Sequence, residues 1–185
     1  MSETEWSSDG GPFELRFYPD PILKRRAKAL ATIDHSVRDR VARMFEIMYE
    51  EGGIGLAAPQ VGWSERVFVI NLTADPDQPE EELVFINPKV TQPSGTDTEE
   101  EGCLSFPDLR IPVARPAEVR VKATALDGSV FELETDDLLA RCVQHELDHL
   151  DGVLFVDRAG FAAKTKAKKA LKELERDYRD AKRGD

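Results

Sequence analysis

The stretch QHELDHLDG, Gln144 to Gly152, places two histidines four residues apart, with a glutamate directly after the first. Residues at positions i and i+4 share one face of an α-helix, so His145 and His149 can approach one point if this stretch is helical. Glu146 would then lie beside that point, where its carboxylate can take a proton from a water molecule. The spacing therefore predicts a helix that carries a metal site.

A plainer interpretation of this box exists, because a helix face can carry two solvated or packed histidines without any metal. The chain has only three histidines, however, and two of them stand at ligand spacing around a glutamate. This concentration favours metal binding. The helix itself is expected to start near Thr135 or Asp136 and to stop at Gly152.

The remaining pattern predicts an α+β fold, with antiparallel strands around the central helix that carries the metal box. Two segments rich in β-branched and aromatic residues, 66–72 and 83–90, predict strands, and 118–134 predicts a hairpin that turns at Asp127-Gly128. Further helices are expected in 34–53, capped by Asp34 or Ser36, and from about Phe161 to Lys182. Hairpins without alternating strands and helices indicate an α+β rather than an α/β architecture.

Length and composition limit the class of protein. The chain has 185 residues, of which 41% are hydrophobic and 33% charged, as in an ordinary soluble domain with one core. It has no run of about 18 apolar residues, so no membrane span is expected. The start lacks the pattern of an export signal, and with two cysteines a disulfide framework is not expected. We therefore predict a cytoplasmic protein.

Charge is unevenly distributed along the chain. The net charge of −11 argues against nonspecific nucleic-acid binding by the body of the protein. Residues 160–185, in contrast, contain nine Lys/Arg against five Asp/Glu. The sequence thus predicts a flexible N-terminal tail (1–12), a catalytic domain (13–159) and a basic amphipathic C-terminal helix (160–185).

A catalytic metal site normally has three protein ligands, so one is needed besides the two histidines. No histidine follows His149, and the segment after it offers only Asp151 and Asp157. Cys142 shares the helix, but it lies about 7.5 Å along the axis from a metal held between the histidines, beyond the reach of its side chain. It is expected to be a small buried residue beside the site. Cys103, in EGCLS, is the favoured ligand, and the alternative is a buried free thiol.

The glycine-rich stretch GGIGLAAPQVG, residues 52–62, formally fits a dinucleotide-binding fingerprint. That fingerprint requires a strand before it and a helix after it, whereas here a helix precedes the loop and Pro59 follows. The glycines instead allow close approach of a backbone, and the amide of Gln60 could stabilise an oxyanion. The alternative is an ordinary turn with a surface glutamine.

Taken together and in this order, GIGLAAPQVG, EGCLS and QHELDHLDG resemble the three signature motifs of peptide deformylase, over about Phe17 to Arg158. The resemblance implies a metal-dependent hydrolase that removes the formyl group from the N-terminal methionine of newly synthesised chains and releases formate. It implies that Cys103, His145 and His149 bind Fe²⁺, with Zn²⁺ or Ni²⁺ able to occupy the same site. It also implies Glu146 as the general acid/base.

The resemblance further implies the residues of the substrate cleft. The Gln60 side chain and the backbone N–H of Leu104 would hold the developing oxyanion. The substrate backbone and the methionine side chain would lie against Gly53, Ile54, Gly55, Leu138, Cys142 and His145. Arg141 departs from the family pattern, because many relatives have an apolar residue there. Its stem is expected to pack on the pocket while its guanidinium reaches solvent.

Several alternatives stay open. A zincin-like metallopeptidase is disfavoured by the missing downstream ligand, and a closed structural metal site would need a fourth protein ligand, which does not stand out. Either Asp151 or Glu101 could orient the histidines. The basic C-terminal helix is either a solvated end piece or, given the family's work on nascent chains, a contact to the ribosome.

Overall fold

The structure is a computed structural model that describes residues 6–8 and 10–184. In chain order its elements are η1 (Pro21–Lys24), α2 (His35–Glu50), β1 (Gly55–Ala57), η2 (Ala58–Val61), β2 (Val67–Ile70), η3 (Pro79–Glu81), β3 (Leu83–Ser94), β4 (Asp97–Cys103), β5 (Phe106–Arg115), β6 (Glu118–Thr124), β7 (Val130–Thr135), α3 (Asp137–Leu150), α4 (Phe155–Arg158) and α5 (Phe161–Gly184).

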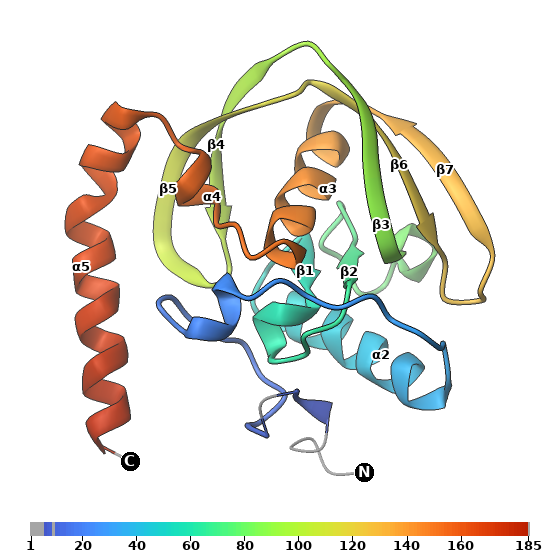
Figure 1. Cartoon of the computed structure of the whole chain (residues 1–185), viewed down its shortest axis with the longest axis horizontal. Helices are drawn as coiled ribbons and strands as arrows, with labels where there is room; N and C mark the ends of the chain where they lie inside the picture. Colours follow the sequence, from blue (N-terminus) through green and yellow to red (C-terminus); the bar gives the residue numbers. More distant parts are fainter. Residues whose placement is uncertain (1–5, 9, 185) are drawn as a thin grey trace.

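Two antiparallel sheets flank helix α3 (Figure 1). The larger sheet has five strands in the order β1-β2-β3-β6-β7, and the smaller one is the pair β4 and β5, which we call the β4–β5 ribbon. In Figure 1 helix α3, in orange, lies between the ribbon and the larger sheet. The predicted α+β architecture around a central helix is confirmed.

Helix α3 has the predicted extent, from an N-cap at Asp136 to Leu150. Gly152 follows with a φ of +71°, and a Cβ there would lie 2.6 Å from the carbonyl oxygen of Lys24, so glycine is required at this turn. The helix buries four polar or charged side chains of the described residues: His145, Glu146, Asp148 and His149. Burial of such groups is costly unless they are paired or bind a metal, so this face is a site rather than ordinary core.

The helix predicted before the ribbon in the sequence and the hairpin predicted after it are also present. The Asp34 carboxylate accepts a hydrogen bond of 3.0 Å from the Val37 N–H, which decides the N-cap of α2 between the two predicted candidates. Strands β6 and β7 pair from Val119–Thr135 to Thr124–Val130. Gly128 adopts a φ of +90° in the turn between them, as the Asp-Gly signal predicts.

The β4–β5 ribbon has no full counterpart in the sequence prediction, which expected only a strand or loop edge at Cys103. Most of β4 is acidic and exposed, and β5 contains Pro107 and Pro112, which cannot donate to a strand ladder. The ribbon tolerates these prolines because each strand has one partner only. It ends in a two-residue turn, Leu104-Ser105, which brings Cys103 opposite Phe106.

Helix α5 attaches to the body along the ribbon (Figure 1). Ala163 and Ala167 are buried in a cluster with residues of β5 and α4, and the Tyr18 hydroxyl donates a 2.8 Å hydrogen bond to Glu175. Its outer face is charged. Neither α5 nor any other helix in the described part of the chain combines the length and apolarity needed to cross a membrane.

The predicted N-terminal tail falls partly outside the described residues, which exclude 1–5 and 9. Of the part that is described, the Ser7 hydroxyl donates to the Gly62 carbonyl oxygen at 3.0 Å, and the Ser8 N–H donates to the same oxygen at 2.7 Å. Trp6 meets Phe13 edge to face, with ring centroids 5.6 Å apart. These residues therefore lie against the body.

Candidate metal centre

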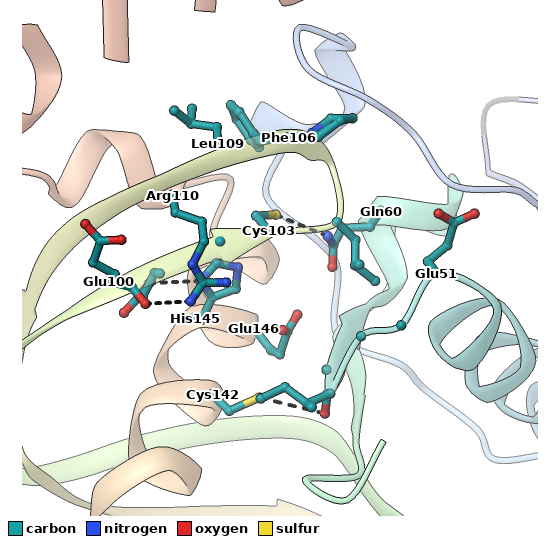
Figure 2. Close-up of a pocket in the computed structure, with 18 of the residues that line it drawn as sticks. Glu51, Gln60, Glu100, Cys103, Phe106, Leu109, Arg110, Cys142, His145 and Glu146 are labelled. Atoms are coloured by element: carbon teal, nitrogen blue, oxygen red, sulfur yellow. Dashed lines mark hydrogen bonds and ion pairs between the residues drawn. The ribbon is translucent and has the colours of Figure 1, made fainter. Parts of the chain in front are cut away.

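Three side chains with metal-binding atoms meet between the ribbon and helix α3. Cys103 is the last residue of β4, and His145 and His149 come from successive turns of α3. One ligand atom from each lies within 4.8 Å of the others, and Cys103 Sγ is 3.3 Å from His149 Nε2. Figure 2 shows Cys103 and His145 facing the same region from strand and helix. The structure thus brings together the three residues predicted as ligands.

The spacing of the Cys103 and His149 ligand atoms fits a divalent cation. Bonds of about 2.3 Å to sulfur and 2.0–2.1 Å to nitrogen, at a tetrahedral angle, separate the two ligand atoms by about 3.5 Å. The observed 3.3 Å between Cys103 and His149 is close to this value. Within the described residues the cluster has three members, which leaves a coordination position for water or substrate, as in catalytic sites.

The two histidines differ in their electrostatic surroundings. Burial and the neighbouring His145 lower the pKa of His149 well below 6.5, which keeps its ring neutral with a free lone pair. Burial alone would also lower the pKa of His145, but its interactions with Cys103 and Glu101 outweigh burial and raise that pKa to about 10. Ligand histidines must be neutral, so this pKa signals a place that favours positive charge, which a bound cation would supply.

Glu101, rather than Asp151, orients the first histidine. His145 Nδ1 lies 3.0 Å from Glu101 Oε2, which leaves Nε2 to face the cluster. Asp151 instead accepts a 2.8 Å hydrogen bond from Arg66 at the surface. His149 Nδ1 has no hydrogen-bond partner among the residues that the structure describes.

Glu101 belongs to a buried ion-pair network. Arg115, whose side chain is only 4% exposed, donates to Glu101 at 2.5 Å and 2.9 Å and to Asp148 at 2.8 Å. Asp148 also accepts 2.7 Å and 3.2 Å bonds from Arg158. Burial alone would raise the pKa of Glu101, but the hydrogen bonds with His145 and Arg115 hold it at about 2, so Glu101 is a carboxylate. No local sequence pattern indicates this network of ion pairs.

Glu146 lies next to the three predicted ligand residues. Its carboxylate is buried, and Oε2 lacks a hydrogen-bond partner within the described residues. Burial raises its pKa to about 7, so near neutral pH it can both accept and return a proton. Figure 2 shows its carboxylate pointing away from helix α3, toward the cavity beside Gln60.

Gln60 is held in one orientation. Its Oε1 accepts a 2.8 Å hydrogen bond from the Ala57 N–H, so its amide nitrogen is directed at Ser105 Oγ (3.1 Å) and at Cys103 Sγ (3.5 Å). Figure 2 shows the Gln60 amide facing the Cys103 sulfur. The glycine stretch before it leads into strand β1 and a 3-10 turn rather than into an α-helix, so it lacks the context of a dinucleotide site.

A cavity of about 590 Å³ opens onto this cluster. Of the predicted site residues it is lined by Gly53, Ile54, Gly55, Gln60, Cys103, Leu104, Leu138, Arg141, Cys142, His145 and Glu146. Its wall also contains residues that sequence reasoning missed, above all Phe17, Phe106, Leu109 and Arg110. Three of these follow Cys103 within the ribbon, so recognition of β5 as a strand would have indicated them.

Two predictions about the helix face have different outcomes. Cys142 is a buried neighbour of the cluster, as expected: its Sγ lies 4.0 Å from the Ile54 carbonyl oxygen, and burial raises the pKa of its thiol well above 9. The expectation that the Arg141 guanidinium reaches solvent is wrong. The side chain is only 11% exposed, and Nη1 donates to Glu101 at 2.7 Å because the ribbon folds back over this part of α3.

Comparisons with known proteins agree with this geometry. The family model described as polypeptide deformylase matches residues 12–166. Peptide deformylases of Acidobacterium capsulatum and Neisseria gonorrhoeae are 45% and 47% identical over 159 residues, which cover 86% of this chain and 93% of each relative. The crystal structure of a Plasmodium falciparum peptide deformylase aligns with a TM-score of 0.88 at 39% identity, covering 90% of this chain and 98% of that one. The chain therefore belongs to the peptide deformylase family of metal-dependent hydrolases, which remove N-formyl groups from nascent peptides.

Proposed function

We propose that Cys103, His145 and His149 bind the catalytic metal ion, with Fe²⁺ as the ion in the cell, and that the substrate is an N-formylmethionyl peptide. The observation that carries this proposal is the cluster of three ligand atoms within 4.8 Å beside a buried carboxylate oxygen of Glu146 that has no partner among the described residues. When bound, the cation would supply Lewis acidity toward the formyl oxygen and lower the pKa of a nearby water.

The residues around the cluster transfer the proton and stabilise the oxyanion. Glu146 takes the proton of the attacking water and returns it to the amine that leaves, a double role that suits a pKa of about 7. The Gln60 amide nitrogen and the Leu104 N–H donate to the oxyanion that develops on the formyl oxygen. The Ala57 N–H holds Gln60 Oε1, so the amide nitrogen faces the cluster, which supports its part as a donor.

The cavity supports selectivity for a formylated methionine. Cys142 and Ile54 offer apolar contacts on its wall, and Leu138 lines it with half of its surface exposed. Gly55 approaches Glu146 so closely that a Cβ would lie 2.6 Å from Oε1, so no side chain fits at this part of the cavity wall. A formyl group, the smallest acyl group, fits such a confined place.

Formate release from a short N-formylmethionyl peptide tests this function. Protein purified anaerobically with Fe²⁺ should release formate, lose this activity on metal chelation, and regain it when Fe²⁺, Ni²⁺ or Zn²⁺ is added. Oxygen should inactivate the iron form fastest, because a thiolate beside Fe²⁺ is a target for oxidants. If metal-loaded protein releases no formate but cleaves casein, the zincin-like alternative replaces this proposal.

We further propose that the catalytic body, residues 13–159, works in the cytoplasm while the helix from residue 160 onward contacts the ribosome. Helix α5 turns Ala163 and Ala167 to the body and leaves its lysines exposed, including Lys166, Lys168 and Lys172. A basic face on a protein of net charge −11 favours a polyanionic partner such as ribosomal RNA.

Removing the charge of these three lysines should weaken association with ribosomes. Truncation would expose the apolar cluster under α5, so the sharper variant is Lys166→Gln/Lys168→Gln/Lys172→Gln. We expect less co-sedimentation at low salt and a salt dependence whose slope falls by about one per lost phosphate contact. Formate release should be unchanged.

The control is Lys89→Gln/Lys122→Gln on the exposed surface of β3 and β6. Equal co-sedimentation of the α5 variant, the control and the unmodified protein would contradict ribosome contact through α5.

A further inference from the structure

Arg141 connects helix α3 to both strands of the ribbon. Its Nη1 donates to Glu101 Oε1 at 2.7 Å and to the Val113 carbonyl oxygen at 3.0 Å. Its Nη2 donates to Asp97 at 3.2 Å (backbone oxygen) and 3.3 Å (carboxylate). Of these partners, Glu101 is the one that reaches a metal-binding side chain.

The Glu101 carboxylate is saturated by these contacts. Oε1 accepts from Arg141 Nη1 and Arg115 Nε, and Oε2 accepts from Arg115 Nη2 and faces His145 Nδ1 at 3.0 Å. A carboxylate offers about four acceptor positions, so all of them are used. Its plane is therefore fixed, and with it the direction of the His145 ring.

Arg115 alone holds the Glu101 carboxylate less firmly than Arg115 and Arg141 do together. Its third guanidinium nitrogen binds Asp148, so its positive charge is shared between two buried carboxylates. Each carboxylate has a second arginine of its own: Arg158 for Asp148 and Arg141 for Glu101. Without Arg141, Oε1 would lose a charge-assisted hydrogen bond, and the carboxylate could turn away from His145.

We propose that Arg141 is a positioning residue of the metal centre, which acts through Glu101 to aim the Nε2 atom of His145 at the metal ion. Partners that hydrogen-bond the second ring nitrogen of a ligand histidine fix its tautomer and orientation, and their loss typically weakens metal affinity by 10- to 100-fold. Arg141 contacts Glu101 and not the histidine itself, so we expect a loss of metal affinity at the lower end of this range. This inference rests on the proposed ligand set.

The competing role for Arg141 is purely structural, as a tie between α3 and the ribbon through Val113 and Asp97. The two roles predict different measurements. A structural tie changes the thermal midpoint of unfolding and leaves the metal site of the folded protein as it was. A positioning role changes the dissociation constant and the ligand-field spectrum of the bound ion.

Titration of the metal-free protein with Co²⁺ measures both quantities. Arg141→Met keeps the long unbranched stem but removes the charge and the donors, and should bind Co²⁺ about 10-fold more weakly, with altered visible absorption bands. Arg141→Lys retains the charge and should recover part of the affinity. The matched control is Asp97→Asn, which alters the outer contact of Arg141 but leaves Glu101 in place, so its Co²⁺ affinity should equal that of the unmodified protein.

The outcomes separate the possible failures. Absence of Co²⁺ binding by the unmodified protein would reject the proposed ligand set itself. Co²⁺ affinity and spectrum unchanged in a folded Arg141→Met protein would overturn the role of Arg141 alone, as would an equal loss in Asp97→Asn. If Arg141→Met does not fold, Arg141→Gln replaces it, since this polar side chain lacks the charge-assisted hydrogen bond of arginine to Glu101. Weaker binding of several-fold then supports the proposal, and unchanged binding rejects it.

Discussion

Replacing Glu146 with glutamine should lower kcat for formate release by about 10²- to 10⁴-fold, the usual contribution of a general acid/base. Glutamine has the shape of glutamate but cannot take a proton from water. The fold should persist, because burial already disfavours the charged form of Glu146, as its raised pKa of about 7 indicates. Metal content should also persist, since Glu146 is not among the three clustered ligand residues.

The matched control for this exchange is Glu51→Gln. Glu51 also lines the cavity, but it is exposed at the rim rather than buried beside the cluster. Its exchange should leave kcat within about twofold, which corresponds to about 0.4 kcal/mol of activation free energy. A Glu146→Gln protein with full metal content and a comparable kcat would show that another group moves the proton.

Gly55→Ala should lower kcat/KM by about 10²-fold, the scale of loss when a catalytic group is displaced by about 1 Å. A Cβ at this position would lie 2.6 Å from Glu146 Oε1 and 2.8 Å from Cys142 Sγ. The Glu146 carboxylate is the end of a flexible side chain, so it can yield without unfolding the protein. The cost should therefore fall on catalysis, while Co²⁺ affinity stays unchanged.

Gly160→Ala provides the control for a glycine-to-alanine exchange, because a Cβ there has no neighbour within 4 Å. It should leave kcat/KM unaltered. If Gly55→Ala acts by displacing Glu146, the same exchange should cost little kcat in a Glu146→Gln protein, since the displaced group no longer transfers a proton. Full additivity of the two effects in kcat would instead place the damage elsewhere.

The features that follow from local chemistry could be predicted from the sequence. The extent of α3 depends on Asp136 at its start and Gly152 after its end, and both are visible as capping and stop signals. The pairing of His145 with His149 follows from the helical repeat alone. The β6–β7 hairpin likewise follows from a short-range signal, Asp-Gly between alternating segments.

The ribbon and the buried charges around it could not be predicted in this way. An acidic β4 and a β5 with two prolines give weak strand signals, and their pairing depends on what packs against them. The partners of Glu101 lie 14, 40 and 44 residues away, at Arg115, Arg141 and His145. Such distances leave no periodic trace in the sequence. Arg141 shows the consequence, since its guanidinium was expected in solvent and lies instead on a buried carboxylate.

The sequence by itself determined the family and its reaction, through three motifs that together contain a thiol, two histidines one helical turn apart and a carboxylate beside them. These motifs are local, so Cys103, His145, His149 and Glu146 could be named without coordinates. The tertiary structure alone decided how the side chains of these residues are oriented. That depends on long-range packing of the ribbon against α3, which buries Glu101 between two arginines and turns it toward His145.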